Sequence, residues 1–188
     1  MFLNKKMENL DCFIEISKGS NIKYEFDKKK NSMRCDRILH TSMGYPGNYG
    51  YIPKTLSDDG DAIDVLLITD YKLNSNTLIR VKIIGVLLME DEAGNDEKLI
   101  CVPHEKVDPT SQYIDDLEDL PKCLLNKILH FFKHYKDNET DKFVKIIGFE
   151  DRFKANKIYA KSKMKYNNNS QMKNIFNDII FNDMCGND

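Results

Sequence analysis

The segment IKYEFD, residues 22–27, alternates apolar and ionisable side chains with a period of two. Its apolar members, Ile22, Tyr24 and Phe26, fall on one face of an extended strand, and the ionisable residues between them fall on the other. This alternation predicts a half-buried strand whose second face is polar. A polar strand face of this kind can form part of a binding or catalytic site.

The same period of two governs the chain from Asp11 to about Met89. It predicts further strands at residues 12–17, 33–40, 64–69, 77–89 and 98–102. The longest of them is expected to bend at Gly85. Residues 58–61 and 92–96 are rich in Asp and Gly and predict turns. Many short strands separated by turns are typical of a small β-barrel.

Helical spacing begins in the second half of the chain. Asp119 is the expected N-cap, Pro121 falls near the first helical position, and apolar residues then recur at helical spacing up to about Tyr135. We expect this helix to pack on the barrel, followed by a strand at 142–149 and a second helix at 151–165. The predicted fold class is therefore mainly β with flanking helices, an α+β fold.

Residues 1–165 are expected to form one domain, and residues 166–188 a separate tail. The Asn-rich segment 167–170 predicts a linker. The apolar tail residues behind it fall on one face of a short helix: Met172, Ile175, Phe176, Ile179 and Ile180. Docking of this face on its own subunit or on a neighbouring copy is favoured over membrane binding, because its polar face has more Asn and Asp than Lys or Arg.

Composition excludes several classes of protein. The 188 residues include 28 Lys and Arg against 30 Asp and Glu, so no net field attracts nucleic acid or an anionic membrane. The apolar runs are much shorter than the roughly 20 residues that a membrane span needs, and the first ten residues lack a secretory core. Five scattered cysteines without a CxxC motif predict reduced thiols and a cytoplasmic protein.

The densest chemical signal is the segment DGDAID, which places Asp59, Asp61 and Asp64 within six residues. Carboxylates this close repel one another unless a cation lies between them, and hard divalent metals take oxygen ligands. An EF-hand loop is excluded, because it requires Gly at the position of Asp64 and Glu at the position of Asp70. A solvated, Asp-rich β-turn is the simpler alternative.

A second acidic turn follows about thirty residues later and contains Asp91 and Asp96 before Lys98. Two such turns can close on one metal cluster. Taken alone, each turn is as readily a solvated loop as a metal site. The interpretation therefore depends on the cationic residues elsewhere in the chain.

Cationic and phenolic side chains that suit phosphoryl oxygens form the other half of the signal. Arginine offers a planar fork, lysine a point charge and tyrosine a neutral donor. The residues concerned are Lys23, Arg37, Tyr45, Tyr49, Tyr135 and Lys136. Each alone is more often a surface residue, but YPGNYGYIP at residues 45–53 has enough aromatic and turn residues to predict a rigid shelf.

Over residues 11–161 the sequence resembles the soluble family I inorganic pyrophosphatases of bacterial type. The resemblance is carried by motifs in the order that the family has them: IEIS, IKYEFD, the pair Asp36-Arg37, YPGNYGYIP, DGDAIDVL, GVLLMEDEAGNDEKL, VPH and HFFKHYKD. It implies an OB-like five-stranded β-barrel flanked by helices. It also implies hydrolysis of pyrophosphate to two phosphates by metal-activated water, with Mg²⁺ as the cofactor, Mn²⁺ or other divalent ions as substitutes, and no covalent intermediate.

The resemblance also implies a role for individual residues. Asp61 matches the general base, and the expected metal ligands are Asp59, Asp64, Asp91 and Asp96. The expected substrate-binding residues are Lys23, Arg37, Tyr49, Lys98, Tyr135, Lys136 and Lys142. Glu15, Glu25 and Tyr45 match secondary site positions. Direct attack by water would then be supported by charge neutralisation and positioning, without a Ser or Cys nucleophile.

The chain departs from the family pattern at a few positions. Ala62 replaces the proline of the usual Asp-Gly-Asp-Pro turn, which keeps all three carboxylates but can loosen the turn. Phe143 and Phe149 stand where tryptophan is frequent, and Gly47 replaces a common cysteine. None of these changes removes an expected ligand, so we expect activity to survive.

His130 and His134 are four residues apart on the predicted helix, but Phe131 stands where an HExxH motif requires Glu. The resemblance places this region at subunit contacts and implies a homo-hexamer, a trimer of dimers. Two other functions are weighed against the enzyme: an OB-fold module that binds nucleic acid, and a catalytically dead relative that binds metal. The carboxylate-rich face argues against the first, and the complete ligand set against the second.

Overall fold

The computed structural model describes residues 10–185, with side chains for residues 10–172. Five strands close into a barrel in the order β1-β4-β5-β8-β6 and back to β1. They are β1 (Leu10–Ile16), β4 (Asn48–Tyr51), β5 (Asp64–Leu67), β6 (Thr77–Asp91) and β8 (Lys98–Pro103). All neighbours are antiparallel except the β5–β8 pair. The expected mainly β fold with a five-stranded barrel and flanking helices is confirmed.

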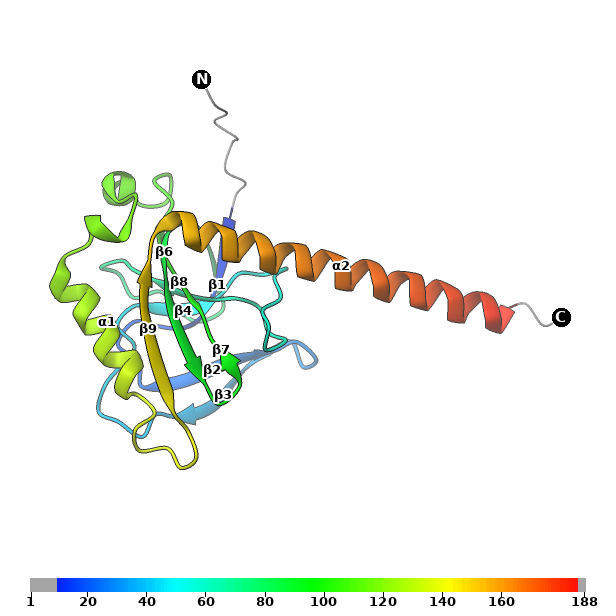
Figure 1. Ribbon diagram of the computed structural model, residues 1–188, viewed down its shortest axis with the longest axis horizontal. Helices are drawn as coiled ribbons and strands as arrows, with labels where there is room; N and C mark the ends of the chain where they lie inside the picture. Colours follow the sequence, from blue (N-terminus) through cyan, green and yellow to red (C-terminus); the bar gives the residue numbers. More distant parts are fainter. Residues whose placement is uncertain (1–9, 186–188) are drawn as a thin grey trace, which may run out of the picture.

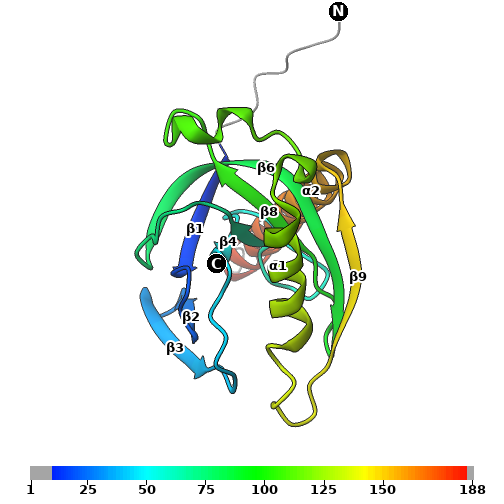
Figure 2. The ribbon, with the colours of Figure 1, turned by 90° about the vertical axis from the view of Figure 1, so that its left-hand side faces the viewer.

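Four further strands extend or flank the barrel. β9 (Val144–Glu150) and the short β7 (Gly94–Asn95) both pair with β6, whereas β2 (Ile22–Asp27) and β3 (Ser32–Ile38) form a separate two-stranded hairpin. In Figure 2 this hairpin lies beside β1, and β9 lies on the opposite side of the molecule. The hairpin therefore stands at the rim of the barrel and presents the polar face of IKYEFD there.

The predicted strands are found close to their expected bounds, but the sequence did not predict β4. Residues 45–53 were expected to form a rigid loop, and instead Asn48–Tyr51 is a barrel strand between β1 and β5. Its glycine explains the missing signal: a Cβ at Gly50 would lie 1.8 Å from the Phe13 carbonyl oxygen. Close approach of two backbones, not side-chain alternation, determines this strand.

The expected bend in the longest strand is present at Gly85. The register of the β6–β8 pairing shifts between Ile83 and Gly85. A Cβ at Gly85 would lie 2.4 Å from the side chain of Leu117. The bend thus brings a connecting segment into direct contact with the barrel, and only glycine leaves room for it.

Two short 3₁₀ helices, η1 (Pro109–Tyr113) and η2 (Leu117–Asp119), precede the helix α1 (Lys122–His134). The prediction that Asp119 caps α1 is wrong, because Pro121 is its N-cap residue. The Asp119 carboxylate instead accepts hydrogen bonds from the backbone N–H groups of Asp115 and Asp116 and closes η2. The apolar face of α1 buries Ile128, Phe131 and Phe132 against the barrel, as expected.

The prediction of a helix ending at residue 165 and a linker at 167–170 is wrong. α2 (Arg152–Cys185) is one continuous helix of 34 residues, and Figure 1 shows it running past the barrel. Asparagine lowers helix stability only modestly, and the segment has no Gly or Pro to end the helix. Met172 is exposed on α2, whereas the other side chains of the apolar tail stripe fall outside the described ones.

Apolar side chains fill the barrel and the interface beneath α1 in two buried clusters. Cys12 and Cys101 are buried among them, and Cys35 and Cys123 are exposed. Neither α1 nor α2 has, over the described residues, an apolar run with the length and hydropathy of a membrane span. The polar rim of the barrel is where the predicted site residues lie.

Candidate active site

Every residue that the sequence predicted for the site lines one cleft of about 340 Å³. The cleft is built from the β2–β3 hairpin, the barrel strands β4, β5 and β8, the end of β6 and the C-terminal end of α1. These segments are far apart in the sequence. The fold therefore brings the carboxylate-rich turns and the cationic residues together, as a binding site for a metal–anion pair requires.

The turn at residues 58–61 presents two carboxylates on the exposed side of the cleft. The Asp61 backbone N–H donates to Asp59 Oδ1 at 2.9 Å, and the Ser57 N–H donates to the Asp61 carbonyl at 2.7 Å. Gly60 has φ +96°, a conformation that L-residues with a Cβ rarely adopt. The glycine thus lets the chain reverse so that Asp59 and Asp61 both line the cleft.

Lys98 lies between two of the expected metal ligands. The parallel β5–β8 register places it beside Asp64, and its ammonium donates to Asp64 Oδ2 at 2.5 Å and also to Asp96. The Tyr49 hydroxyl donates to the same Asp64 oxygen at 2.7 Å. Burial disfavours the charge on Lys98, but the two carboxylates outweigh burial and raise the pKa of Lys98. Lys98 is therefore a charged, buried partner of the carboxylates.

The carboxylate set fits a hard divalent cation by its chemistry. Burial raises the pKa of Asp96, and the charges of Asp64 and Asp91 raise it further although Lys98 opposes them. The single positive charge of Lys98 therefore does not balance the negative charges of Asp64, Asp91 and Asp96. Among the described residues that line the cleft there is neither sulfur nor imidazole, so the candidate metal ligands are carboxylate oxygens, the ligands that Mg²⁺ and Mn²⁺ prefer. Within the described side chains no three His, Cys, Asp or Glu groups are already converged on one point.

The second acidic turn faces the end of α1. Lys136, which is only 5% exposed, donates to Asp91 Oδ2 at 2.8 Å and to Glu92 Oε2 at 3.2 Å. Lys142 pairs with Glu92 at 2.9 Å. Burial works against the charge on Glu92, but hydrogen bonds from Lys142 and Lys136 lower the pKa of Glu92 to about 2. Glu92 therefore holds two of the expected phosphate-binding lysines at the cleft.

The β2–β3 hairpin supplies the other cations. Its register places Lys23 opposite Arg37. Lys23 pairs with Glu25 at 2.6 Å, and Arg37 pairs with Asp36 at 2.8 Å and with Glu139 at 3.2 Å. Three carboxylates thus surround the two cations and orient them at the cleft. The hairpin cations and their partners together carry no excess positive charge, so a polyanion would need additional positive charge such as a divalent cation.

A wall of packed aromatic rings supports the phenols of the site. The Tyr45 ring lies 4.8 Å from that of Phe131 and 5.1 Å from that of Tyr49, and Phe131 stacks on Tyr135 at 5.3 Å. Burial raises the pKa of Tyr45, Tyr49 and Tyr135. These hydroxyls remain protonated at neutral pH and can donate hydrogen bonds to an anion without adding charge.

Glu15 lies deeper in the cleft, on β1. Its carboxylate accepts a hydrogen bond from the Phe26 N–H at 2.7 Å and so joins the hairpin to the barrel. Burial, together with the charges of Asp64 and Glu25, raises the pKa of Glu15 to about 7 although Phe26 and Lys23 oppose the shift. A cation bound in the cleft would stabilise this carboxylate as well.

Sequence reasoning missed several residues that belong to the site. Glu92 and Lys28 line the cleft, and Asp36 and Glu139 orient Arg37. Glu92 lies inside the second acidic turn, and Asp36 beside Arg37, so the motifs did contain a signal for both. Glu139 follows α1 in a segment without a motif, and only the fold brings it to Arg37.

The geometry agrees with the comparisons to known proteins. The family model described as inorganic pyrophosphatase matches residues 12–167. The chain belongs to the inorganic pyrophosphatase family. It is 46% identical over 159 residues to the inorganic pyrophosphatase of Helicobacter pylori strain 26695, covering 85% of this chain and 92% of that protein. It is 50% identical over 145 residues to that of Saccharolobus solfataricus, covering 77% and 84%.

Solved structures agree at the level of the fold. The Helicobacter pylori inorganic pyrophosphatase superposes with a TM-score of 0.84 at 44% identity and covers 89% of this chain and 98% of that chain. The family match ends at residue 167, whereas α2 continues to Cys185.

Proposed function

We propose that this protein hydrolyses inorganic pyrophosphate to two phosphates by direct attack of water, with Mg²⁺ as the cofactor. The observation that carries the proposal is the single cleft that collects the carboxylate set and the cation set of the family. Mn²⁺ suits the same oxygen donors. The other two readings receive no support: carboxylates on the rim repel a nucleic-acid backbone, and a dead relative would lack part of the ligand set.

Asp59, Asp64, Asp96 and Asp91 would hold the cations. Divalent cations supply the charge that brings the pKa of a water close to neutrality. Asp61 is the expected base: it faces the cleft, its backbone N–H is held by Asp59, and its carboxylate is exposed to water. Lys98 pairs with both Asp64 and Asp96 and holds them together at the floor of the cleft.

The cationic side of the cleft would bind the phosphoryl oxygens. Lys23 and Arg37 approach from the hairpin, and Lys136 and Lys142 from the segment around the end of α1. Tyr49 and Tyr135 can add neutral hydrogen bonds. Charge developing on the leaving phosphate meets fixed cations in a partly water-excluded site, which is where electrostatic stabilisation is most effective. The described residues that line the cleft include no Ser or Cys nucleophile.

The test compares phosphate release from pyrophosphate in Mg²⁺ for the wild type, Asp61→Asn and a matched control, Asp70→Asn. Asp70 is exposed and lies outside the cleft. We expect Asp61→Asn to lose on the order of 10²-fold or more in kcat and Asp70→Asn to match the wild type. Wild-type turnover in Asp61→Asn would overturn the assigned base.

We also propose that the protein is a cytoplasmic homo-hexamer, a trimer of dimers. Two histidines of α1, the exposed His130 and the half-buried His134, support a contact surface there. Their rings lie 4.8 Å apart, and His134 faces Asp137 at 2.8 Å. The four cysteines with described side chains are unpaired, as in a reducing compartment. Sedimentation of the wild type and of His134→Ala tests the assembly, and a wild-type monomer would contradict it.

A further inference from the structure

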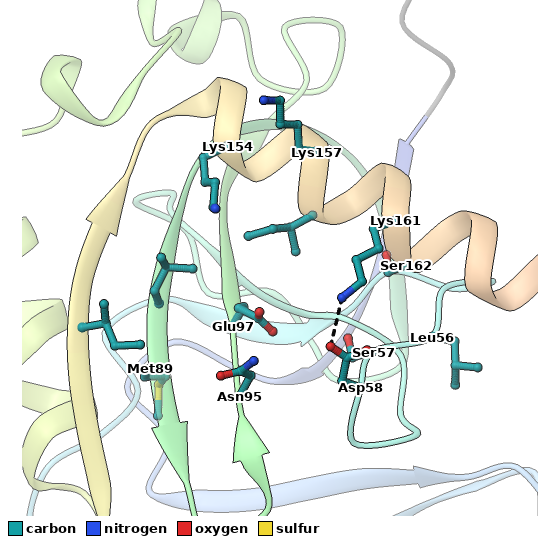
Figure 3. Close-up of a pocket in the computed structure, with 13 residues that line it drawn as sticks. Leu56, Ser57, Asp58, Met89, Asn95, Glu97, Lys154, Lys157, Lys161 and Ser162 are labelled. Carbon is teal, nitrogen blue, oxygen red and sulfur yellow. Dashed lines mark hydrogen bonds and ion pairs between the residues drawn. The ribbon is translucent and has the colours of Figure 1, made fainter.

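Helix α2 is fastened to the turn that carries Asp59 and Asp61. Two lysines one helical turn apart converge on the Asp58 carboxylate: Lys161 Nζ at 3.0 Å and Lys165 Nζ at 3.1 Å. Figure 3 shows Lys161 reaching down from α2 to Asp58. Lys165 also donates to the Ser57 carbonyl at 2.7 Å. These contacts connect the helix directly to the start of the carboxylate turn.

A backbone contact runs parallel to these ion pairs. The Leu56 N–H donates to the Ser162 carbonyl of α2 at 3.0 Å, and Ser162 is only 4% exposed. Ser57 in turn donates its N–H to the Asp61 carbonyl at 2.7 Å. A continuous path of hydrogen bonds therefore leads from α2 through Ser57 to Asp61, the expected base.

The turn itself has little intrinsic rigidity. Gly60 has φ +96°, and a Cβ there would meet no atom of the described residues within 4 Å. Ala62 stands where proline would restrict φ. Asp58, Asp59, Gly60 and Asp61 are all exposed. The turn has internal hydrogen bonds, from the Ser57 N–H to the Asp61 carbonyl and from the Asp61 N–H to Asp59 Oδ1. The contacts of α2 with Ser57 and Asp58 add to them from outside the turn.

We propose that Lys161 and Lys165 are positioning residues that hold the Asp59–Gly60–Asp61 turn in its metal-binding conformation by fastening Asp58 and Ser57 to α2. The two lysines act through the turn and do not themselves line the cleft. The catalytic consequence rests on the proposed pyrophosphatase function. The ordering of the turn does not depend on that function, and it can be measured in the protein without metal or substrate.

The expected effect is moderate because the pairs are solvent-exposed. The Lys161 side chain is 70% exposed and that of Asp58 is 49% exposed, and single pairs of this kind contribute little. Two pairs and a carbonyl contact act on one short turn, so loss of both lysines should weaken Mg²⁺ binding roughly three- to tenfold. Screening by high salt should reduce the difference from wild type.

The experiment uses the double variant Lys161→Met/Lys165→Met in the full-length protein, with Lys154→Met as the matched control. Lys154 lines the same hollow between α2 and the barrel, as Figure 3 shows, but forms no ion pair with any described residue. A third variant, Lys161→Arg/Lys165→Arg, keeps the charges. Circular dichroism and thermal unfolding establish that each variant folds.

Two readouts separate positioning from a general loss of stability. The first is hydrogen exchange of residues 57–63 in the metal-free protein, which should be several-fold faster in the Met/Met variant and restored by the Arg/Arg variant. The second is Mg²⁺ binding by calorimetry, together with the Mg²⁺ concentration that gives half-maximal hydrolysis. The Kd for Mg²⁺ and the Mg²⁺ concentration for half-maximal hydrolysis should both rise roughly three- to tenfold in the Met/Met variant. The KM for pyrophosphate at saturating Mg²⁺ should stay within about twofold of the wild type.

A double-mutant cycle tests the route through Asp58. If the lysines act on this carboxylate, adding Asp58→Asn to the Met/Met variant should weaken Mg²⁺ binding less than Asp58→Asn does in the wild type. Unchanged exchange of residues 57–63 in the Met/Met variant, or fully additive effects on Mg²⁺ binding, would overturn the proposal. A wild type that neither binds Mg²⁺ nor hydrolyses pyrophosphate would overturn the proposed function instead, and the exchange data would still decide the ordering of the turn.

Discussion

Replacement of Lys98 by methionine is the most informative single change at the floor of the cleft. Methionine matches the length of the lysine stem but removes the charge. Lys98 is 3% exposed and donates to both Asp64 and Asp96. Without it, two adjacent carboxylates lose their shared cation in a site where water cannot fully compensate.

The magnitude follows from the burial of the partners. Removing one partner of a buried pair costs about 3–5 kcal/mol. The Asp64 side chain is 30% exposed and keeps its hydrogen bond from Tyr49, whereas Asp96 is 14% exposed. We therefore expect the metal-free Lys98→Met protein to lose about 3 kcal/mol of unfolding free energy, at the lower end of that range.

The assay is urea unfolding in EDTA and again in excess Mg²⁺, with Lys82→Met as control. Lys82 also projects from a barrel strand, but its partner Asp115 is 63% exposed, so its loss should cost less than about 1 kcal/mol. Mg²⁺ should stabilise Lys98→Met more than wild type, because the unpaired carboxylates gain a new cation. Equal stability of wild type and Lys98→Met in EDTA would refute the argument that Lys98 is the main counter-charge of the cluster.

Three further predictions concern other parts of the molecule. In metal-free buffer, Glu15→Gln should flatten the pH dependence of stability, because the native carboxyl has a pKa of about 7 against an ordinary 4.5. The wild type should therefore lose about 3 kcal/mol of unfolding free energy as pH rises through this window, and pH-dependent urea unfolding should find this loss absent from the variant. Gly85→Ala should lower the free energy of unfolding by about 1–3 kcal/mol, because the new Cβ would lie 2.4 Å from the Leu117 side chain. Adding Leu117→Ala should recover part of this loss in thermal unfolding, and strictly additive effects of the two substitutions would argue against that contact. Arg37→Lys should raise the KM for pyrophosphate about tenfold in steady-state assays, with a smaller change in kcat, because lysine lacks the planar guanidinium fork. An unchanged KM would remove Arg37 from the phosphate-binding set.

Much of the β structure could be predicted because apolar and polar side chains alternate along its strands. IKYEFD and the long strand through Gly85 show this period directly, and both are strands in the structure. β4 could not be predicted in this way. It is short, contains Gly50 and follows Gly47, and its position depends on close backbone approach to β1, which leaves no pattern in its own side chains.

Helix boundaries were less predictable for physical reasons that the structure identifies. Asp119 has the right residue type for an N-cap, but its carboxylate is used to close η2. The Asn-rich segment 167–170 has weak helix propensity without a breaker, and it continues a helix that is already formed. Local composition alone does not distinguish a linker from the middle of a long helix.

The expected site residues could be gathered by motif, but their pairings could not. Lys98 was expected to bind substrate, and the structure places it between Asp64 and Asp96. Glu92 and Glu139 became part of the site only through contacts across the fold, to Lys136 and to Arg37. The pairings of Glu92 and Glu139 join residues 44 and 102 positions apart and therefore leave no local signature.

Phosphate release from pyrophosphate by the purified wild-type protein, measured in Mg²⁺ and in EDTA, tests the central claim most directly. We predict two phosphates for each pyrophosphate consumed in Mg²⁺, and a rate in EDTA no higher than that of the enzyme-free control. Absence of phosphate release in Mg²⁺, or the same rate in EDTA, would contradict the account of a metal-dependent pyrophosphatase built on this cleft.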